Sequence, residues 1–311
     1  MKQKNILLVP SNNGYGHLRR LSSLLPEFVE NGVKPSIVWD RRIPFPKDLF
    51  ANYNFDLIQL NTPLNFDGPF VRCDANYDNN ELKRFVSSFD AVIADGVSWP
   101  LKMSERAFCT SHFLWDLYYL RKENNKTNWL ESLAQLKSEI VFFSMRDFVW
   151  EEIFNLGVVK ELPVLDYWNL RPYSAKRNDD IVHISSGIKS NKIDNVYKNS
   201  NSILNSKKIY AVENYVKDGN SCPTAVICRG GLGAITESIS MKSVLIFLPD
   251  DDLEIKENMN KCLGSGFALK VEQISGNLEN DMQRLTQKRN EIEWPEVLSM
   301  SSLAKMILGE L

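Results

Sequence analysis

Short apolar runs alternate with amphipathic stretches along the first half of the chain. The apolar runs predict buried strands at residues 4–10, 36–39, 55–60, 90–94 and 140–144. Between them, apolar residues at helical spacing predict helices over 18–30, 81–89, 127–136 and 149–156. Strands that are buried on both faces and separated by helices are typical of a parallel, doubly wound α/β sheet.

A second cycle follows a stretch with two prolines and no periodicity. It predicts strands at 181–184, 208–212, 225–228 and 244–248, each followed by a turn and a helical segment, and one final helix from Trp294 onward. We therefore expect two Rossmann-like domains, which would form a cleft, with ligands at the C-terminal ends of the strands. The predicted division is an N-terminal domain over 1–163, a connection over 164–178, a C-terminal domain over 179–293 and a helix over 294–311, which can pack back on the first domain.

Composition narrows the class of protein. Among 311 residues, 43% are hydrophobic and 24% are charged, which is the balance of a folded soluble chain. A formal net charge of −2 without runs of like charge argues against a nucleic-acid partner. We find no signal peptide and no apolar window long enough to cross a bilayer. Five scattered cysteines without a CxxC pair indicate reduced thiols in a cytoplasmic protein.

The loop after the first predicted strand reads SNNGYGHLRR. Gly14 and Gly16 allow a tight turn and close approach of the backbone to a ligand, and the following helix offers unpaired N–H groups. His17 at the mouth of this loop, next to Tyr15, can accept a proton near neutral pH. A histidine that only caps or packs at the helix start is the alternative.

A second glycine-rich loop, CRGGLGAITES, follows the predicted strand at 225–228. Its glycines Gly230, Gly231 and Gly233 would expose backbone amides to a diphosphate, and Glu237 lies one turn into the next helix, where it can accept hydrogen bonds from a ribose. The loop is neither a P-loop nor a nicotinamide fingerprint, because the Lys-Ser/Thr pair and the glycine spacing are missing. A tight strand–helix turn with Thr236 as a capping residue is the structural alternative.

Together the two loops resemble the GT-B glycosyltransferases, most closely the family-28 group typified by the N-acetylglucosaminyltransferase of peptidoglycan lipid-intermediate synthesis. The likeness lies in GYGHLRR and in the block that runs from the second loop to residue 268. Matching order and spacing are found for Gly230, Gly231, Gly233, Glu237, Pro249, Glu254, Asn258, Leu263, Gly266 and Ala268.

The resemblance implies that the C-terminal domain holds a UDP-sugar. Residues facing the nucleotide and the sugar would be Ser186, Gly187, Arg229, Gly230, Gly231, Gly233, Thr236, Glu237, Glu254 and Asn258. In the N-terminal domain, Gly14, Tyr15, Gly16 and Asp95 would lie on the acceptor side, with His17 as the catalytic base. It further implies an inverting transfer of a hexose or N-acetylhexosamine to a hydroxyl acceptor, without a metal or other cofactor, in cell-envelope polysaccharide synthesis.

The sequence departs from the group at Ile255, where relatives place a sugar-reading glutamine, so the donor sugar stays open. GYGHLRR is also similar to the loop of the UDP-sugar hydrolase of pseudaminic acid synthesis, in which water replaces the acceptor. A non-catalytic nucleotide-sugar-binding partner subunit is the third alternative.

Several further residues have two interpretations. Asp95 ends a predicted strand and would either face the cleft or cap the next segment. The aromatic stretch 113–120 fits a core position better than peripheral contact with the inner face of a membrane, near a lipid-linked acceptor. His112 fits a core histidine better than a cleft residue. Arg19 and Arg20 would either meet an acidic acceptor or be exposed helix residues without such a role.

Overall fold

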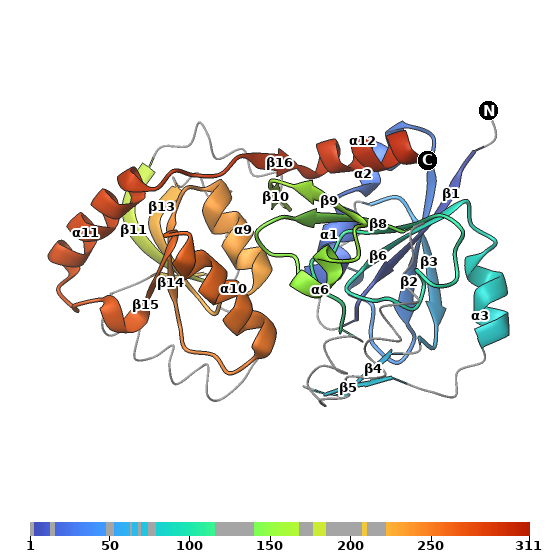
Figure 1. Ribbon diagram of the computed structural model, residues 1–311, viewed down its shortest axis with the longest axis horizontal. Helices are drawn as coiled ribbons and strands as arrows, with labels where there is room; N and C mark the ends of the chain where they lie inside the picture. The colour runs from blue at the N-terminus through green and yellow to red at the C-terminus, as the bar shows by residue number, and fades with distance from the viewer. Residues whose placement is uncertain are drawn as a thin grey trace. The chain divides into compact units, whose positions relative to one another are not determined.

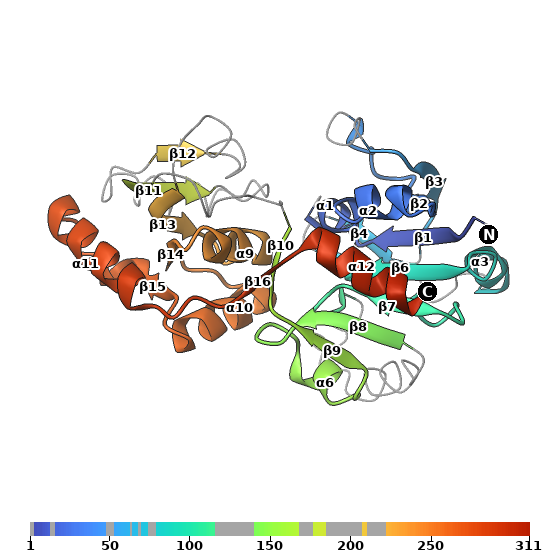
Figure 2. The same cartoon turned by 90° about the horizontal axis from the view of Figure 1, so that it is seen from above.

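The computed structural model describes residues 3–12, 16–47, 53–62, 64–67, 70–73, 79–115, 140–167, 177–184, 207–209 and 222–311. The chain divides into two compact units. The first consists of Met1–Leu162 together with Met300–Leu311, and the second of Pro163–Ser299. Figures 1 and 2 show the elements of each unit in two orthogonal views.

The first unit is built on a parallel sheet of seven strands in the order β3-β2-β1-β6-β7-β8-β9. These strands are β1 (Asn5–Pro10), β2 (Lys34–Asp40), β3 (Asp56–Leu60), β6 (Ala91–Asp95), β7 (Ala107–Cys109), β8 (Ile140–Met145) and β9 (Val159–Leu162). The described helices are α1 (Gly16–Ser22), α2 (Leu25–Glu30), α3 (Asn79–Val86), α6 (Glu151–Phe154) and α12 (Met300–Glu310), and β4 (Leu64–Asp67) pairs antiparallel with β5 (Phe70–Cys73).

The strand order of this sheet reverses between β1 and β6. Their C-terminal residues, Pro10 and Asp95, are paired in the register of the sheet. Open parallel sheets bind ligands at such a reversal, because the loops leaving the two strands diverge there. His17 belongs to α1, the first described helix after β1 in the chain, and Asp95 ends β6 at the same edge as the end of β1.

The second unit contains a parallel sheet in the order β12-β11-β13-β14-β15. Its elements are β11 (Arg177–Ile184), β12 (Lys207–Ile209), β13 (Cys222–Cys228), β14 (Val244–Phe247), β15 (Ala268–Lys270), α9 (Leu232–Ser240), α10 (Leu253–Gly264), η3 (Val271–Gln273) and α11 (Leu278–Glu291). Outside this sheet, β10 (Val164–Asp166) pairs with β16 (Val297–Ser299). The two parallel sheets confirm the predicted α/β class.

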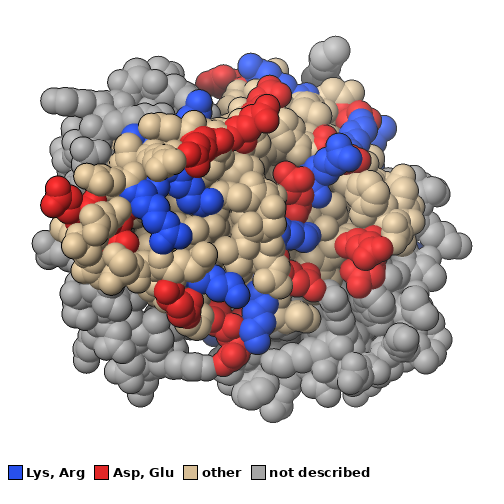
Figure 3. Space-filling model, turned by 60° about the vertical axis from the view of Figure 1, so that its left-hand side comes forward, with Lys and Arg blue, Asp and Glu red and all other residues tan. Residues whose placement is uncertain are grey.

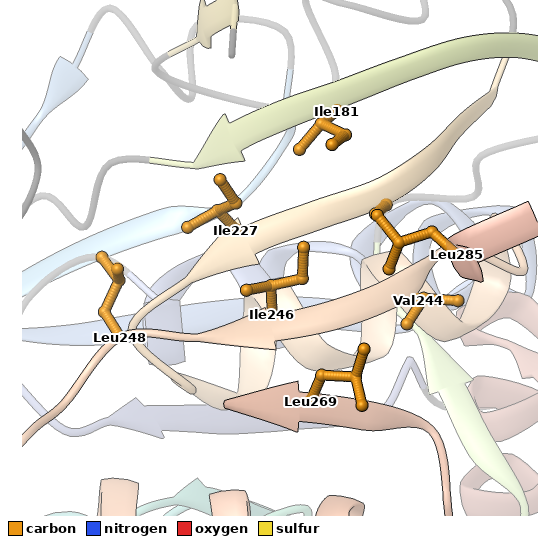
Figure 4. Close-up of a cluster of buried hydrophobic side chains, with 8 residues drawn as sticks. Ile181, Ile227, Val244, Ile246, Leu248, Leu269 and Leu285 are labelled. Carbon is orange, nitrogen blue, oxygen red and sulfur yellow. The ribbon is translucent and has the colours of Figure 1, made fainter. Parts of the chain in front are cut away.

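Alternate residues of these strands form a core that Figure 4 shows from within the second unit. The cluster consists of Ile181, Ala225, Ile227, Val244, Ile246, Leu248, Leu269 and Leu285, all at most 6% exposed. Leu285 belongs to α11, which covers this face of the sheet, while α9 packs on the other face (Figure 2). Burial on both faces explains why the strand sequences are continuously apolar rather than alternating.

Two expected helices differ from the structure. The helix predicted over 18–30 is divided into α1 and α2, because Pro26 in the first turn of α2 has no N–H to continue the ladder. The last helix begins at Met300 instead of Trp294, because Val297–Ser299 forms β16 and pairs with β10. β10 lies at the start of the stretch that we expected to be a connection. The helix expected over 127–136 lies outside the described residues.

Helix α12 packs against α2 within the first unit (Figure 1). Ser301 donates a hydrogen bond to Glu27 across this contact, at 2.6 Å. Figure 3 shows acidic and basic side chains interspersed on the described surface, in keeping with the near-neutral net charge. In the described part of the chain, no helix has both the length and the apolar character that crossing a bilayer requires.

Lys242 follows α9 with a φ of 52°, a left-handed backbone that favours glycine. We expect Lys242→Gly to raise the free energy of unfolding by about 0.5–1 kcal/mol, because the contact of Cβ with the neighbouring carbonyl disappears. Urea unfolding of the whole chain measures this difference. Lys242→Ala keeps Cβ and should stay within about 0.5 kcal/mol of the parent. Equal behaviour of the two variants would contradict the assignment of strain.

Candidate functional site

Asp95 is the centre of a polar cluster at the C-terminal end of β6. Its side chain is fully buried, yet both oxygens are paired. Arg20 donates from Nε to Oδ2 at 2.8 Å and from Nη2 to Oδ1 at 2.5 Å. Thr110 donates to Oδ2 at 3.0 Å, and His17 Nδ1 lies 2.6 Å from Oδ1. The carboxylate therefore joins α1 to β6 and to the end of β7.

His17 and Arg20 are three residues apart on α1, so they lie on one face of the helix. Gly96, the next residue after Asp95, has a φ of +81° and lies against the imidazole. A Cβ on Gly96 would be only 2.6 Å from His17 Cε1. Glycine is thus required here both by the backbone and by the close approach of the ring.

The hydrogen bonds of His17 define its tautomer. Trp115 Nε1 donates to His17 Nε2 at 3.1 Å, and an indole nitrogen can only donate. Nε2 is therefore unprotonated, and the single proton of a neutral imidazole sits on Nδ1. Nδ1 lies 2.6 Å from Asp95 Oδ1 and 2.6 Å from Arg20 Nη2, and of these two only the carboxylate can accept the proton. The arrangement leaves a lone pair on Nε2, the ring nitrogen that faces away from the carboxylate.

Burial and charge act together on the two titrating groups. Burial and the neighbouring Arg20 cation lower the pKa of His17, and Asp95 only partly opposes them. Burial works to raise the pKa of Asp95, but Arg20 and His17 outweigh it and hold that pKa well below its usual range. At neutral pH the cluster therefore consists of a carboxylate, a guanidinium and an uncharged imidazole.

In the second unit, Arg229 follows β13 and forms an ion pair with Asp250, which follows β14. Arg229 Nη2 lies 3.3 Å from Asp250 Oδ1, and Nε makes the closer contact with Oδ2. Burial works against the cation, but the bonds to Asp250 raise the pKa of Arg229. Asp252, two residues on, caps α10 by accepting from the backbone N–H groups of Glu254 and Ile255.

The three glycines of the loop after β13 serve different purposes. Gly230 has a φ of +88°, and a Cβ there would lie 2.6 Å from Met259 Cγ on α10. Gly231 caps α9 with a φ of −65°, and Gly233 lies in its first turn. No described atom comes within 4 Å of a Cβ built on Gly231 or Gly233. Among the described residues, neither the packing nor the Gly231 backbone requires glycine there, and the space beside these two positions at the N-terminus of α9 is open.

The remaining predicted donor residues lie in α9 and α10. Thr236 does not cap α9, because its hydroxyl donates back to the Gly233 carbonyl at 3.0 Å. Glu237 is 6% exposed and close enough to Cys228 to add to the burial that raises the pKa of this thiol to about 12. On α10, Asn258 is buried and donates to Glu254 at 3.5 Å.

Gly14, Tyr15, Ser186 and Gly187 lie outside the described residues. Gly16 is exposed and begins α1, directly before His17. His112 is buried, with its ring centroid 4.8 Å from that of Phe113, as expected of a core histidine. Phe113, Leu114 and Trp115 are also buried, so this part of the aromatic stretch belongs to the core.

Sequence reasoning missed Arg20, Trp115 and Asp250. Arg20 was expected to be exposed but is 7% exposed. Its spacing of three residues from His17, which lies directly before the helix predicted over 18–30, was a usable signal. The chain itself indicates neither the Trp115 contact, 98 residues away from His17, nor the pairing of Arg229 with Asp250, 21 residues apart.

No protein-family model matches the chain, and no curated protein matches it by sequence. Solved structures do match. The glycosyltransferase of kitacinnamycin superposes with a TM-score of 0.61 at 12% identity, covering 100% of both chains. MurG of Acinetobacter baumannii gives a TM-score of 0.60 at 11% identity, covering 98% of this chain and 99% of its own. Arabidopsis thaliana UGT89C1, solved with UDP, gives 0.60 at 11%, covering 99% of each chain.

These neighbours are glycosyltransferases, and they include the MurG type to which the sequence showed a resemblance. Identities of 11–12% over nearly full length establish shared architecture rather than shared substrates. The chain therefore has the GT-B fold of glycosyltransferases, as its two glycine-rich loops predicted.

Proposed function

We propose that the protein is an inverting, metal-independent glycosyltransferase that moves a hexose or N-acetylhexosamine from a UDP-sugar to a hydroxyl acceptor. One observation carries the proposal. A buried, uncharged His17, whose unprotonated Nε2 accepts a hydrogen bond from Trp115, lies beside Asp95 at the reversal point of the first sheet. Proton acceptors of this kind suit the activation of a hydroxyl group.

In this proposal His17 Nε2 removes the proton of the acceptor hydroxyl. The acceptor oxygen forms a bond to C1 of the sugar while the bond from C1 to the diphosphate oxygen breaks. UDP leaves, and the product glycoside has the anomeric configuration opposite to that of the donor. Asp95 accepts from Nδ1 and stabilises the imidazolium that forms. Because Trp115 donates to Nε2 in this structure, the acceptor hydroxyl has to replace the indole N–H.

We assign donor binding to the second unit. The open N-terminus of α9, with Gly231 and Gly233, offers backbone N–H groups to a diphosphate, and Arg229 supplies a cation next to it. Glu237 in α9 is the proposed partner of the ribose hydroxyls. Glu254 and Asn258, in the first turns of α10, would face the sugar, and Ser186 and Gly187 the phosphates.

The same groups make a metal unnecessary in the proposal, because amides and a guanidinium stabilise the charge that develops on the departing UDP. A solved neighbour that contains UDP has the same fold and supports a UDP-linked donor. We further propose a cytoplasmic protein acting in cell-envelope polysaccharide synthesis, on a glycan, a small molecule or a lipid-linked acceptor at the inner face of the membrane.

His17→Ala should lower kcat by about 10²–10⁴, because the proton acceptor is lost. Asp95→Asn should also lower kcat, since an amide cannot stabilise the imidazolium. UDP affinity, measured by calorimetry, should remain near that of the parent in both variants. Sugar transfer from UDP-GlcNAc and UDP-glucose to a panel of acceptors, with and without EDTA, gives the turnover numbers.

Unchanged turnover in His17→Ala would contradict the mechanism, and loss of turnover in EDTA would contradict metal independence. Free sugar released without any acceptor would identify the hydrolase instead. Selective UDP binding without turnover in any condition would favour a non-catalytic binding subunit.

Gly233→Ala should raise the free energy of unfolding by about 0.5–1 kcal/mol, because alanine favours the helix and its Cβ meets no described atom. The same methyl group should weaken UDP binding at least several-fold, because it projects where the diphosphate approaches α9. Calorimetry and urea unfolding give the two quantities.

Gly264→Ala in α10 is the matched control, since a Cβ there also meets no described atom. It should leave UDP affinity unchanged. If Gly233→Ala binds UDP as tightly as the parent protein, the diphosphate does not lie against the first turn of α9.

A further inference from the structure

Arg20 is a buried cation that pairs with Asp95 and also approaches His17. Its side chain is 8% exposed, and two parallel N–H groups bind the two oxygens of Asp95. An ion pair withdrawn from water in this way adds little net stability, because desolvation offsets the attraction. A purpose other than stability therefore has to explain the pair, and its position against His17 suggests one.

The charges of the cluster can be counted. The Asp95 carboxylate and the Arg20 guanidinium cancel, so an uncharged His17 leaves the buried cluster neutral, whereas an imidazolium would leave one uncompensated positive charge. Without Arg20, the carboxylate would instead be matched by an imidazolium. Removal of Arg20 thus favours the charged histidine for two reasons. Asp95 attracts the imidazolium, and the repulsion between the imidazolium and the guanidinium is lost.

The remaining neighbours of the ring do not change this balance. Among the described residues, the charged groups acting on His17 are Arg20 from α1 and Asp95 from β6. Trp115 and Phe113, which contact the imidazole from its other sides, are uncharged, as is Thr110 beside Asp95. Arg20 Nη2 approaches His17 Nδ1 to 2.6 Å, so its charge acts at short range.

We propose that Arg20 is a positioning residue for the base: by pairing with Asp95 it keeps His17 uncharged, with the proton on Nδ1, so that Nε2 stays available in slightly acid as well as neutral solution. This inference rests on the proposed function of His17, but the ionisation state of the ring can be measured whether or not turnover is found.

Nitrogen NMR of protein labelled with ¹⁵N-histidine tests it directly, because the chain has only three histidines and His17→Gln identifies the signal of interest. In the parent, His17 should be the uncharged Nδ1–H tautomer at pH 7 and titrate below the ordinary value of about 6.5. In Arg20→Gln the titration midpoint should rise by about one pH unit or more. Arg20→Lys retains the charge and should stay close to the parent.

Arg19→Gln is the matched control, because it removes the same charge from the preceding residue of α1 without touching the pair with Asp95. Its His17 midpoint should equal that of the parent. A protonated His17 at pH 7 in the parent would overturn the proposal, even if Arg20→Gln does not fold. An unchanged midpoint in folded Arg20→Gln would overturn it as well.

Kinetics give the second readout. The acid limb of the pH profile of kcat should move to higher pH in Arg20→Gln, so that kcat falls about tenfold at pH values below both midpoints and recovers towards the parent value near pH 8.5. KM for the UDP-sugar should not change. An equal loss of kcat at every pH would indicate a merely structural role and contradict the proposal. Absence of turnover in the parent would refute the proposed function, while the NMR titration would still decide the role of Arg20.

Discussion

The first unit is organised around a negative charge that has no access to water. Asp95 is fully buried, and its burial is tolerable only because Arg20, Thr110 and His17 satisfy both oxygens. Removing one partner of such a group leaves a buried charge without compensation, which typically lowers the free energy of unfolding by about 3–5 kcal/mol. The carboxylate therefore fixes α1 against β6, and with it the orientation of the imidazole and the narrow space at Gly96.

Much of the fold was predictable because long apolar runs have one interpretation. Strands β1, β6, β8, β13 and β14 were expected near their observed bounds, since continuous burial on both faces leaves a strong signal. The prediction of short elements failed for a physical reason. Val297–Ser299 carries two apolar residues that fit a helix face equally well, and only the pairing with β10 decides that it is a strand. Pro26 was visible, and its effect on the helix could have been predicted.

The site was predictable as a set of loops and not as a set of contacts. The position of His17 after the first strand and of Asp95 at the end of another followed from the pattern, and the sheet brings the ends of β1 and β6 together. The partners did not follow, because hydrophobicity patterns treat arginine as a surface residue. Burial of Arg20 depends on a carboxylate 75 residues further along the chain, and no local propensity encodes that distance.

In each of the two units, an arginine near the candidate site is paired with an aspartate. Arg20 is matched by Asp95, and Arg229 is matched by Asp250, so neither site presents an unpaired guanidinium among the described residues. On the proposed function, a diphosphate at Arg229 has to share that cation with Asp250, close to Asp252 and Glu254. Net attraction for anions is therefore weak, and recognition depends on directed N–H groups at the open end of α9. Such a site discriminates by geometry more than by charge, because a simple anion cannot satisfy the same donors at once.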